Sequence, residues 1–236
     1  GRPFMDVIFR CPPELESILP KPIPAKRGLP DWLKAMPTHV DAAELGLELQ
    51  TVKKCPPFVD AMGAGWLMPL AADIHVENGR FTWDWDPPPP SFANYTRAPL
   101  SFHPNHQVIQ TPFYEEDRQA LKFTNYWSVT LPKGYAMLAT HPVNRADLPF
   151  RSLTGLVDAA NWKSLVHFPA IWVDDDFSGV LPKGTPVAQC YPVAHETLNL
   201  KMGLLENEDA DALTDAEAAV RDTDGAYRRL YRSKPE

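Results

Sequence analysis

Short β-prone runs separated by turn residues fill the middle of the chain. The clearest runs cover residues 126–131, 135–140, 164–173 and 185–193. Runs of this length, rich in aromatic and β-branched residues, predict β-strands. The sequence Leu-Pro-Lys-Gly occurs twice, at residues 131–134 and 181–184. Proline fixes φ at the first corner of a turn and glycine allows a positive φ at the next, so both segments predict tight reversals.

A hairpin is predicted upstream of these runs. A strand expected over residues 66–76 is followed by Asn78-Gly79, a strong two-residue hairpin signal, and by a return strand over 80–85. The return strand has an aromatic residue at every second position. Because alternate residues of a strand face the same side, this spacing predicts one buried aromatic face.

The N-terminal part of the chain is rich in proline. A strand is expected over residues 4–10, followed by an extended proline-rich arm. Asp31 is suited to cap a short helix over residues 32–36, and Trp32 is expected to anchor the arm on a neighbouring surface.

The C-terminal part changes to a helical pattern. Thr214 and Glu217 match a capping box, which predicts a helix over residues 215–232. The chain is therefore expected to comprise an N-terminal strand and arm (1–50), a β-barrel domain (51–195) and a C-terminal helical segment (196–236).

Composition narrows the class of protein. The 236 residues are 44% apolar, enough for a large core, and the 26 prolines leave little room for long helices before residue 196. A net charge of −7 argues against a general nucleic-acid or anionic-membrane surface. Three widely spaced cysteines favour reduced thiols, with Cys190 buried and inert. With no membrane-length apolar run and no signal-peptide pattern, a cytoplasmic location is expected.

Several segments of residues 121–193 match known motifs in order. They are Phe123-Thr124-Asn125, Leu131-Pro132-Lys133-Gly134-Tyr135, Gly155-Leu156-Val157-Asp158 and Gly184-Thr185-Pro186-Val187-Ala188-Gln189, with Ala64-Gly65-Trp66 further upstream. This order resembles the dUTPase and dCTP deaminase superfamily, which has the β-clip fold. The resemblance covers about one third of the chain. The whole chain also resembles a group of uncharacterised phage and bacterial proteins.

The resemblance implies a mainly β protein built on a β-clip barrel, with an N-terminal arm and a C-terminal helix. It implies that Asp158 activates water as a base and that a small polar or nucleotide-like ligand lies at the barrel rim. Members of the superfamily are commonly trimers with sites between subunits, so a homo-oligomer, either trimer or dimer, is expected. The phosphate-binding Arg-Ser-Gly motif is absent near residues 142–144, and Thr185 and Pro186 replace an Asp-Arg pair.

Further candidate ligand-binding residues surround Asp158 in this interpretation. Trp162 and Trp127 are candidate stacking surfaces, and Arg145 can hold an anion in a bidentate way. The remaining polar candidates are Asn125, Asn144 and Gln189. Each also has a structural alternative: Asp158 can cap its own turn, the tryptophans can be core residues, and Arg145 can pair with Asp147.

Two other functions stay open at this level. His103, His106 and His141 could bind Zn²⁺ or Fe²⁺ through neutral imidazoles, which would make the protein a metal-dependent enzyme. Alternatively, the chain is a non-catalytic structural or assembly protein that has kept the scaffold, and the missing phosphate motifs favour this interpretation. The sequence does not decide whether the protein is an enzyme.

Overall fold

The computed structural model describes residues 4–91 and 94–233. Strand makes up 28% and helix 21%, and the strand pairs are antiparallel, so the expected mainly β class with a C-terminal helix is confirmed. The chain forms two compact units. The main unit comprises Met5–Ala35 and Ala61–His195, and the small unit comprises Met36–Asp60, residues 196–233 and Phe4. Residues 36–50, expected to continue the N-terminal arm, therefore group with the C-terminal segment.

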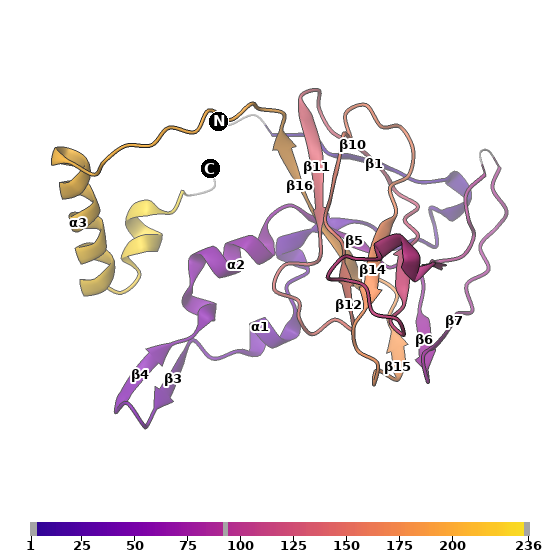
Figure 1. Cartoon of the computed structure of the whole chain (residues 1–236), viewed down its shortest axis with the longest axis horizontal. Coiled ribbons are helices and arrows are strands. Elements are labelled where there is room, and N and C mark those ends of the chain that lie inside the picture. Colours follow the sequence, from indigo (N-terminus) through magenta and orange to yellow (C-terminus); the bar gives the residue numbers. More distant parts are fainter. Residues whose placement is uncertain (1–3, 92–93, 234–236) are drawn as a thin grey trace. The chain divides into compact units, whose positions relative to one another are not determined.

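A five-stranded antiparallel sheet runs through the main unit (Figure 1). Its strand order is β13 (Gly155–Val157), β11 (Tyr135–Thr140), β16 (Pro186–Ala194), β5 (Trp66–Pro69) and β2 (Ile23–Pro24). β11 covers the expected run of residues 135–140, and β16 differs from the expected run by one residue at each end. Leu138 of β11 faces Leu156 of β13 on one side and Tyr191 of β16 on the other.

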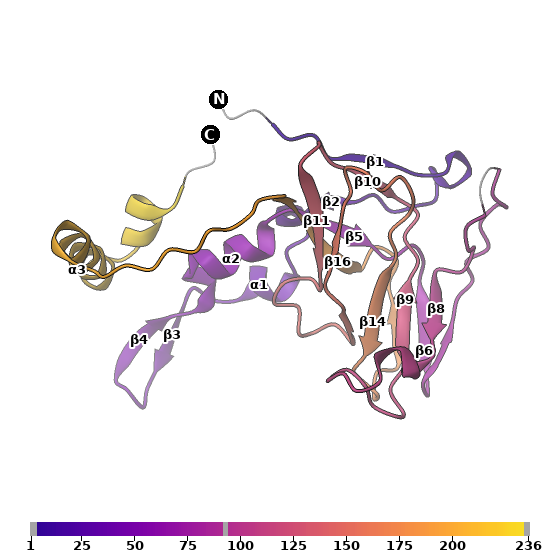
Figure 2. The same ribbon diagram turned by 45° about the horizontal axis from the view of Figure 1, so that its top comes forward.

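Three smaller sheets complete the main unit. They are β12 (Phe150–Ser152), β14 (Phe168–Trp172), β9 (Ala120–Phe123) and β8 (Leu100–His103); β15 (Gly179–Leu181), β6 (Ile74–Glu77) and β7 (Arg80–Thr82); and β1 (Ile8–Arg10) with β10 (Ser128–Thr130). Figure 2 shows β14, β9 and β8 side by side. Among the described strands no sheet closes on itself, so the strand pairing does not form the expected barrel.

One hydrophobic core joins these sheets. Phe123 of β9 and Phe150 of β12 are fully buried, with ring centroids 4.8 Å apart in an edge-to-face arrangement. The aromatic residues expected on one face of the return strand, Phe81, Trp83 and Trp85, are partly buried against the same core. The burial of one aromatic face, which the aromatic residues at every second position predicted, is therefore confirmed.

The hairpin turn forms where the sequence predicts it, whereas the strand expected over residues 66–76 is not continuous. Asn78 and Gly79 have φ values of 49° and 71°, as a two-residue hairpin requires. The expected strand over residues 66–76 is instead interrupted between β5 and β6. There the amide of Leu70 donates to Thr185 at 2.8 Å, and its carbonyl accepts from Gly184 at 2.9 Å. The backbone of Leu70 is thus bonded to the second Leu-Pro-Lys-Gly turn.

Gly65 allows α2 (Pro56–Gly63) to lead directly into β5. Its φ is +69°, and a Cβ atom built there would lie 1.9 Å from the carbonyl oxygen of Cys190. Any side chain at this position would therefore meet the backbone of β16. Glycine is required both for the left-handed conformation and for the close approach.

Buried leucines hold the N-terminal arm on the main unit together with the expected Trp32, whose indole nitrogen is buried near the Asp147 carboxylate. Leu15 and Leu33 are buried, whereas Trp32 is only half-buried. The strand expected over residues 4–10 is limited to β1, and the short helix α1 (Asp31–Ala35) begins at Asp31. Short 3-10 turns occupy the chain at η1 (Pro13–Leu15), η2 (Ala25–Arg27) and, further on, η4 (Asn105–Val108).

The small unit contains a hairpin and the C-terminal helices. Its elements are β3 (His39–Ala42), β4 (Leu47–Gln50), η3 (Val52–Lys54), the first turns of α2, α3 (Asn207–Asp222) and the π-helix η5 (Tyr227–Tyr231). The capping-box prediction is wrong: Thr214 lies inside α3, where its hydroxyl donates to the carbonyl of Ala210 at 3.0 Å. The expected single helix over 215–232 is broken at Gly225, whose φ is +71°. No helix among the described residues is both long and apolar enough to span a membrane.

Glu14 ties the arm to the loop after the proline run, which generates a prediction about acid stability. Its carboxylate accepts from the Tyr95 hydroxyl at 2.7 Å and from the Ser91 amide at 2.9 Å. These bonds, the Tyr95 bond above all, lower the pKa of Glu14 from 4.5 to about 2. A pKa that is depressed on folding adds stability above the unfolded value, and this is lost as pH falls from about 4.5 towards 2.

Replacing Glu14 by Gln should therefore flatten the dependence of stability on pH in this window. Urea unfolding midpoints measured at intervals between the two pKa values test this expectation. Glu16→Gln is the matched control, because Glu16 is an exposed carboxylate two residues away. Equal pH slopes for the wild type and Glu14→Gln would contradict the assignment.

Candidate functional site

Gln189 is a buried hydrogen-bonding centre in the main unit. Its side-chain amide donates to the carbonyls of Ala61 and Ala64 at 2.9 and 2.8 Å, and more weakly to Met62 at 3.3 Å. Its side-chain oxygen accepts from the amide of Val143 at 2.9 Å. Because Gln189 is 1% exposed, these partners replace water entirely. The side chain therefore joins the end of α2, β16 and the loop after β11, and it lines neither of the two cavities described below.

Asn125 and Trp127 have a comparable structural role. The Asn125 side chain donates to the carbonyls of Trp127 and Val166 at 2.7 and 2.9 Å, and accepts from the amide of Trp127 at 2.9 Å. The indole N–H of Trp127 donates to the carbonyl of Pro20 at 2.9 Å. Both residues are buried, so they fix the start of β10 and hold the arm in place.

His141 has both ring nitrogens bonded to the backbone. Nδ1 accepts from the amide of Ser152 at 3.1 Å, so Nε2 carries the proton and donates to the carbonyl of Arg145 at 2.9 Å. Burial lowers the pKa of His141. A neutral ring bonded in this way has no lone pair left for a metal ion.

The other two candidate metal ligands lie elsewhere in the fold. His103 ends β8 and is half-buried, while His106 is exposed on η4. Within the described residues, no three histidine, cysteine, aspartate or glutamate side chains are grouped so that they could hold a metal ion. The described residues therefore do not group the three histidines as a metal site, and Zn²⁺ or Fe²⁺ binding stays a prediction.

Arg145 forms the ion pair that was its structural alternative. Its Nε and Nη2 atoms each donate to Asp147 at 2.9 Å, in a bidentate arrangement. This pairing lowers the pKa of Asp147 against the opposing effect of burial. The neighbouring Asn144 is exposed and has a positive φ of 58°, which suits the turn after β11.

Asp158 lies on an exposed turn next to Trp162. Its carboxylate accepts from the Asn161 side-chain amide at 2.8 Å and lies 3.8 Å from His195. The Asn161 bond is the largest influence on the Asp158 pKa, which is lowered, so the group stays ionised at neutral pH. Trp162 is 52% exposed. Neither residue lines the two cavities described below, and the assignment of Asp158 as a base stays a prediction.

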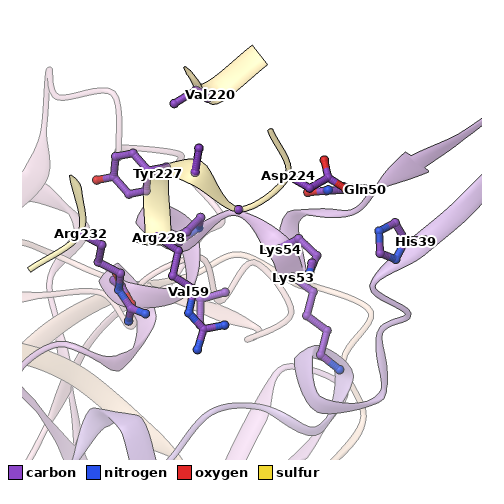
Figure 3. A pocket seen from close by; sticks show the side chains of 14 residues that line it. His39, Gln50, Lys53, Lys54, Val59, Val220, Asp224, Tyr227, Arg228 and Arg232 are labelled. Atoms are coloured by element: carbon purple, nitrogen blue, oxygen red, sulfur yellow. The ribbon is translucent and has the colours of Figure 1, made fainter. Parts of the chain in front are cut away.

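The larger of these cavities lies in the small unit and contains none of the predicted site residues (Figure 3). We call it the cationic cavity; its volume is about 630 Å³. It is lined by His39, Gln50, Lys53, Lys54, Pro56, Val59, Asp60, Val220, Asp224, Gly225, Ala226, Tyr227, Arg228 and Arg232. A second, shallower hollow of about 560 Å³ lies beside Trp66 and Pro22 in the main unit.

Comparisons with known proteins do not assign the chain to a family. No protein-family model matches the chain, and no curated protein matches it. The resemblance to the β-clip superfamily therefore rests on the order of the motifs alone.

Sequence reasoning missed the cationic cavity because its walls come from segments about 170 residues apart. One usable signal was present, since three arginines occur within residues 228–232. In the single α-helix expected over residues 215–232, these arginines lie in the last turns, where they would only complement the helix dipole. The break at Gly225 and the π-helix that follows gave two of them a different environment.

Replacing Gln189 by Met should destabilise the fold strongly. The change keeps the side-chain size but removes the Gln189 partner of the Val143 amide and of the Met62 and Ala64 carbonyls, while the Ala61 carbonyl keeps the Tyr191 hydroxyl. Each unsatisfied buried group costs about 1 to 3 kcal/mol, so the free energy of unfolding should fall by at least about 3 kcal/mol. Urea denaturation measures this change.

Gln107→Met provides the matched control, because Gln107 is exposed on η4. It should alter the free energy of unfolding by less than about 0.5 kcal/mol. A loss below about 1 kcal/mol for Gln189→Met would show that the four contacts of Gln189 are not needed for stability.

Proposed function

We propose that this chain is a non-catalytic subunit of a homo-oligomeric assembly, built on a β-clip-like scaffold. The observation that carries the proposal is the segment of residues 196–206, which we call the arm segment. It presents a row of large apolar side chains to solvent directly after β16. Surfaces of this kind mark protein–protein contacts.

The use of the predicted site residues supports a structural role. Gln189, Asn125 and Trp127 are buried and bonded to the backbone, and Arg145 is paired with Asp147. A site that binds a polar ligand keeps several such groups directed into a cavity. Here the same side chains connect strands, turns and the N-terminal arm to each other.

The small unit provides the second line of support, since it has almost no core of its own. Its described apolar residues include only Ala42 and Ala226 in the buried class. Val40, Leu47 and Leu49 lie on one face of the β3–β4 hairpin and are 40–51% exposed. A two-stranded hairpin is marginally stable alone, so this face requires a partner surface.

The arm segment has the alternating apolar pattern of a β-strand, although it is not paired with a sheet in the described part of the chain. Leu198, Leu200, Met202 and Leu204 occupy alternate positions and are 76–90% exposed. In an extended chain these four side chains lie on one face. Asn199 and Lys201 would lie on the opposite face. The arm segment therefore suits addition to the edge of another sheet, with its apolar face covered.

The energetics favour a reciprocal exchange. Burying the four large apolar side chains of this face contributes roughly 6 to 12 kcal/mol. Association itself costs about 4 to 15 kcal/mol. Burial of one arm segment would thus only about offset the cost of association. If two copies exchange their arm segments, the burial free energy roughly doubles while the cost of association is incurred once.

The edge of the five-stranded sheet at β13 is the receiving surface in this proposal. Among the described strands, β13 pairs only with β11, and its Leu156 is 63% exposed. Leu156 stands in one cross-strand row with Leu138 and Tyr191, which the partner's arm would extend. The opposite edge, β2, contains Pro24, which cannot donate a ladder hydrogen bond.

Light scattering of the full chain tests the proposal. We expect a mass of two or more times the 26.5 kDa monomer at micromolar concentration. Leu198→Ser combined with Leu200→Ser should raise the dissociation constant at least about a hundredfold, because two large apolar contacts are lost. The variant should then elute with the monomer mass and an unchanged circular dichroism spectrum.

Asn199→Ser combined with Lys201→Ser is the matched control, because it changes two residues on the other face of the same segment. It should keep the wild-type mass. Leu156→Lys, at the receiving edge, should dissociate the assembly as the leucine variant does. A monomeric wild type, or equal masses for both arm variants, would refute the role of the arm segment.

A further inference from the structure

The cationic cavity has the size of a small-molecule site. Its volume of about 630 Å³ falls within the roughly 300 to 1,000 Å³ typical of ligand pockets. Its walls are all in the small unit: the β3–β4 hairpin and η3 on one side, and the C-terminal segment from Val220 to Arg232 on the other. Figure 3 shows the lining side chains.

The lining carries positive charge although the chain as a whole is acidic. Lys53, Lys54, Arg228 and Arg232 outnumber the lining carboxylates, Asp60 and Asp224, by two. The chain has a net charge of −7. A local excess of cations in a concave surface focuses the field and attracts anions.

Arg232 is already positioned for such a role. Its Nε atom donates to Asp60 at 2.8 Å, and its Nη2 atom donates to the other oxygen of the same carboxylate. A guanidinium has five N–H donors, so three remain after this pairing. Asp60 thus fixes the plane of the guanidinium while leaving donors for an anion.

The π-helix brings a second arginine to the same wall. The amide of Arg232 donates to the carbonyl of Tyr227 at 2.9 Å, the five-residue spacing of a π-turn. This spacing keeps Tyr227, Arg228 and Arg232 on one face, and all three line the cavity. In the described part of the chain, neither Arg228 nor Lys54 has a carboxylate partner.

The side chains are segregated within the cavity. Figure 3 shows Arg228 and Arg232 extending in the same direction near Val59, while Asp224 lies beside Gln50, away from Arg232. The apolar lining consists of Pro56, Val59, Val220, Ala226 and Tyr227. The two arginines and the apolar residue Val59 therefore lie on the same wall of the cavity.

We propose that the cationic cavity binds a small organic phosphate. Arg228 and the remaining donors of Arg232 hold the phosphate, and Lys54 adds positive charge. Planar guanidinium groups match phosphate oxygens in a bidentate way, and two excess cations match a dianion. The apolar part of the ligand lies against Tyr227 and Val59. No residue that lines this site lies in the arm segment.

Isothermal titration calorimetry of the full chain with phenyl phosphate tests the proposal. We expect saturable binding at one site per chain, and weaker binding of inorganic phosphate, which lacks the apolar part. Phenol, which lacks the charge, should not bind measurably. Raising the salt concentration should weaken phenyl phosphate binding. No saturable binding of phenyl phosphate up to about 10 mM would overturn the proposal.

Arg228→Gln and Arg229→Gln form a matched pair of variants. Both remove one positive charge from neighbouring exposed positions, but only Arg228 lines the cavity. Arg228→Gln should lower the affinity for phenyl phosphate roughly ten- to a hundredfold, the range for one charge-assisted hydrogen bond. Arg229→Gln should lower it less than about threefold. Equal losses in both variants would mean general charge attraction and would overturn the site.

Discussion

The buried amide of Gln189 is the contact on which the main unit depends. It joins three parts of the chain that are distant in sequence: the end of α2, the strand β16 and the loop at Val143. The approach of α2 to β16 is close enough that Gly65 is required beside it. A buried polar group of this kind must be fully satisfied, because an unpaired donor or acceptor is costly in a dry interior. The core sheet and its connecting loops therefore have to form together.

This constraint explains the position of several predicted site residues in the main unit. The polar residues near the predicted rim are the same residues that complete the fold, as Asn125 and His141 illustrate. The small unit is the opposite case. Its apolar side chains are largely exposed, and Lys54 and Arg228 line a cavity. Residues with unused binding capacity are the better candidates for function, since groups already bonded within the fold must lose those bonds to act.

Much of the fold could be predicted from local sequence signals. The hairpin at Asn78-Gly79, the strand β11 and the mainly β class follow from turn residues and from periodicity, which act over a few positions. Predictions failed where distant contacts decide. The backbone of Leu70 interrupts an expected strand because it bonds to a turn more than 100 residues away. The capping box at Thr214 failed for a different reason, because the helix continues towards the N-terminus through residues that are equally compatible with it. For the candidate site, the sequence showed that Gln189, a polar residue in a predicted strand, needs hydrogen-bond partners. It could not show whether those partners are backbone groups of the fold or a bound ligand.

The arm segment and the cationic cavity belong to the same unit, and this has a thermodynamic consequence. A unit whose described residues include only Ala42 and Ala226 in the buried apolar class gains little stability from its own packing. In the proposed assembly, a second copy or a small ligand that binds the folded form would add to its stability. Anything that binds the ordered form stabilises it by mass action. If assembly orders the small unit, the walls of the cavity are ordered as well, and the ligand meets a lower entropic cost. By reciprocity, a ligand that holds η3 and η5 together favours the assembled state by the same free energy.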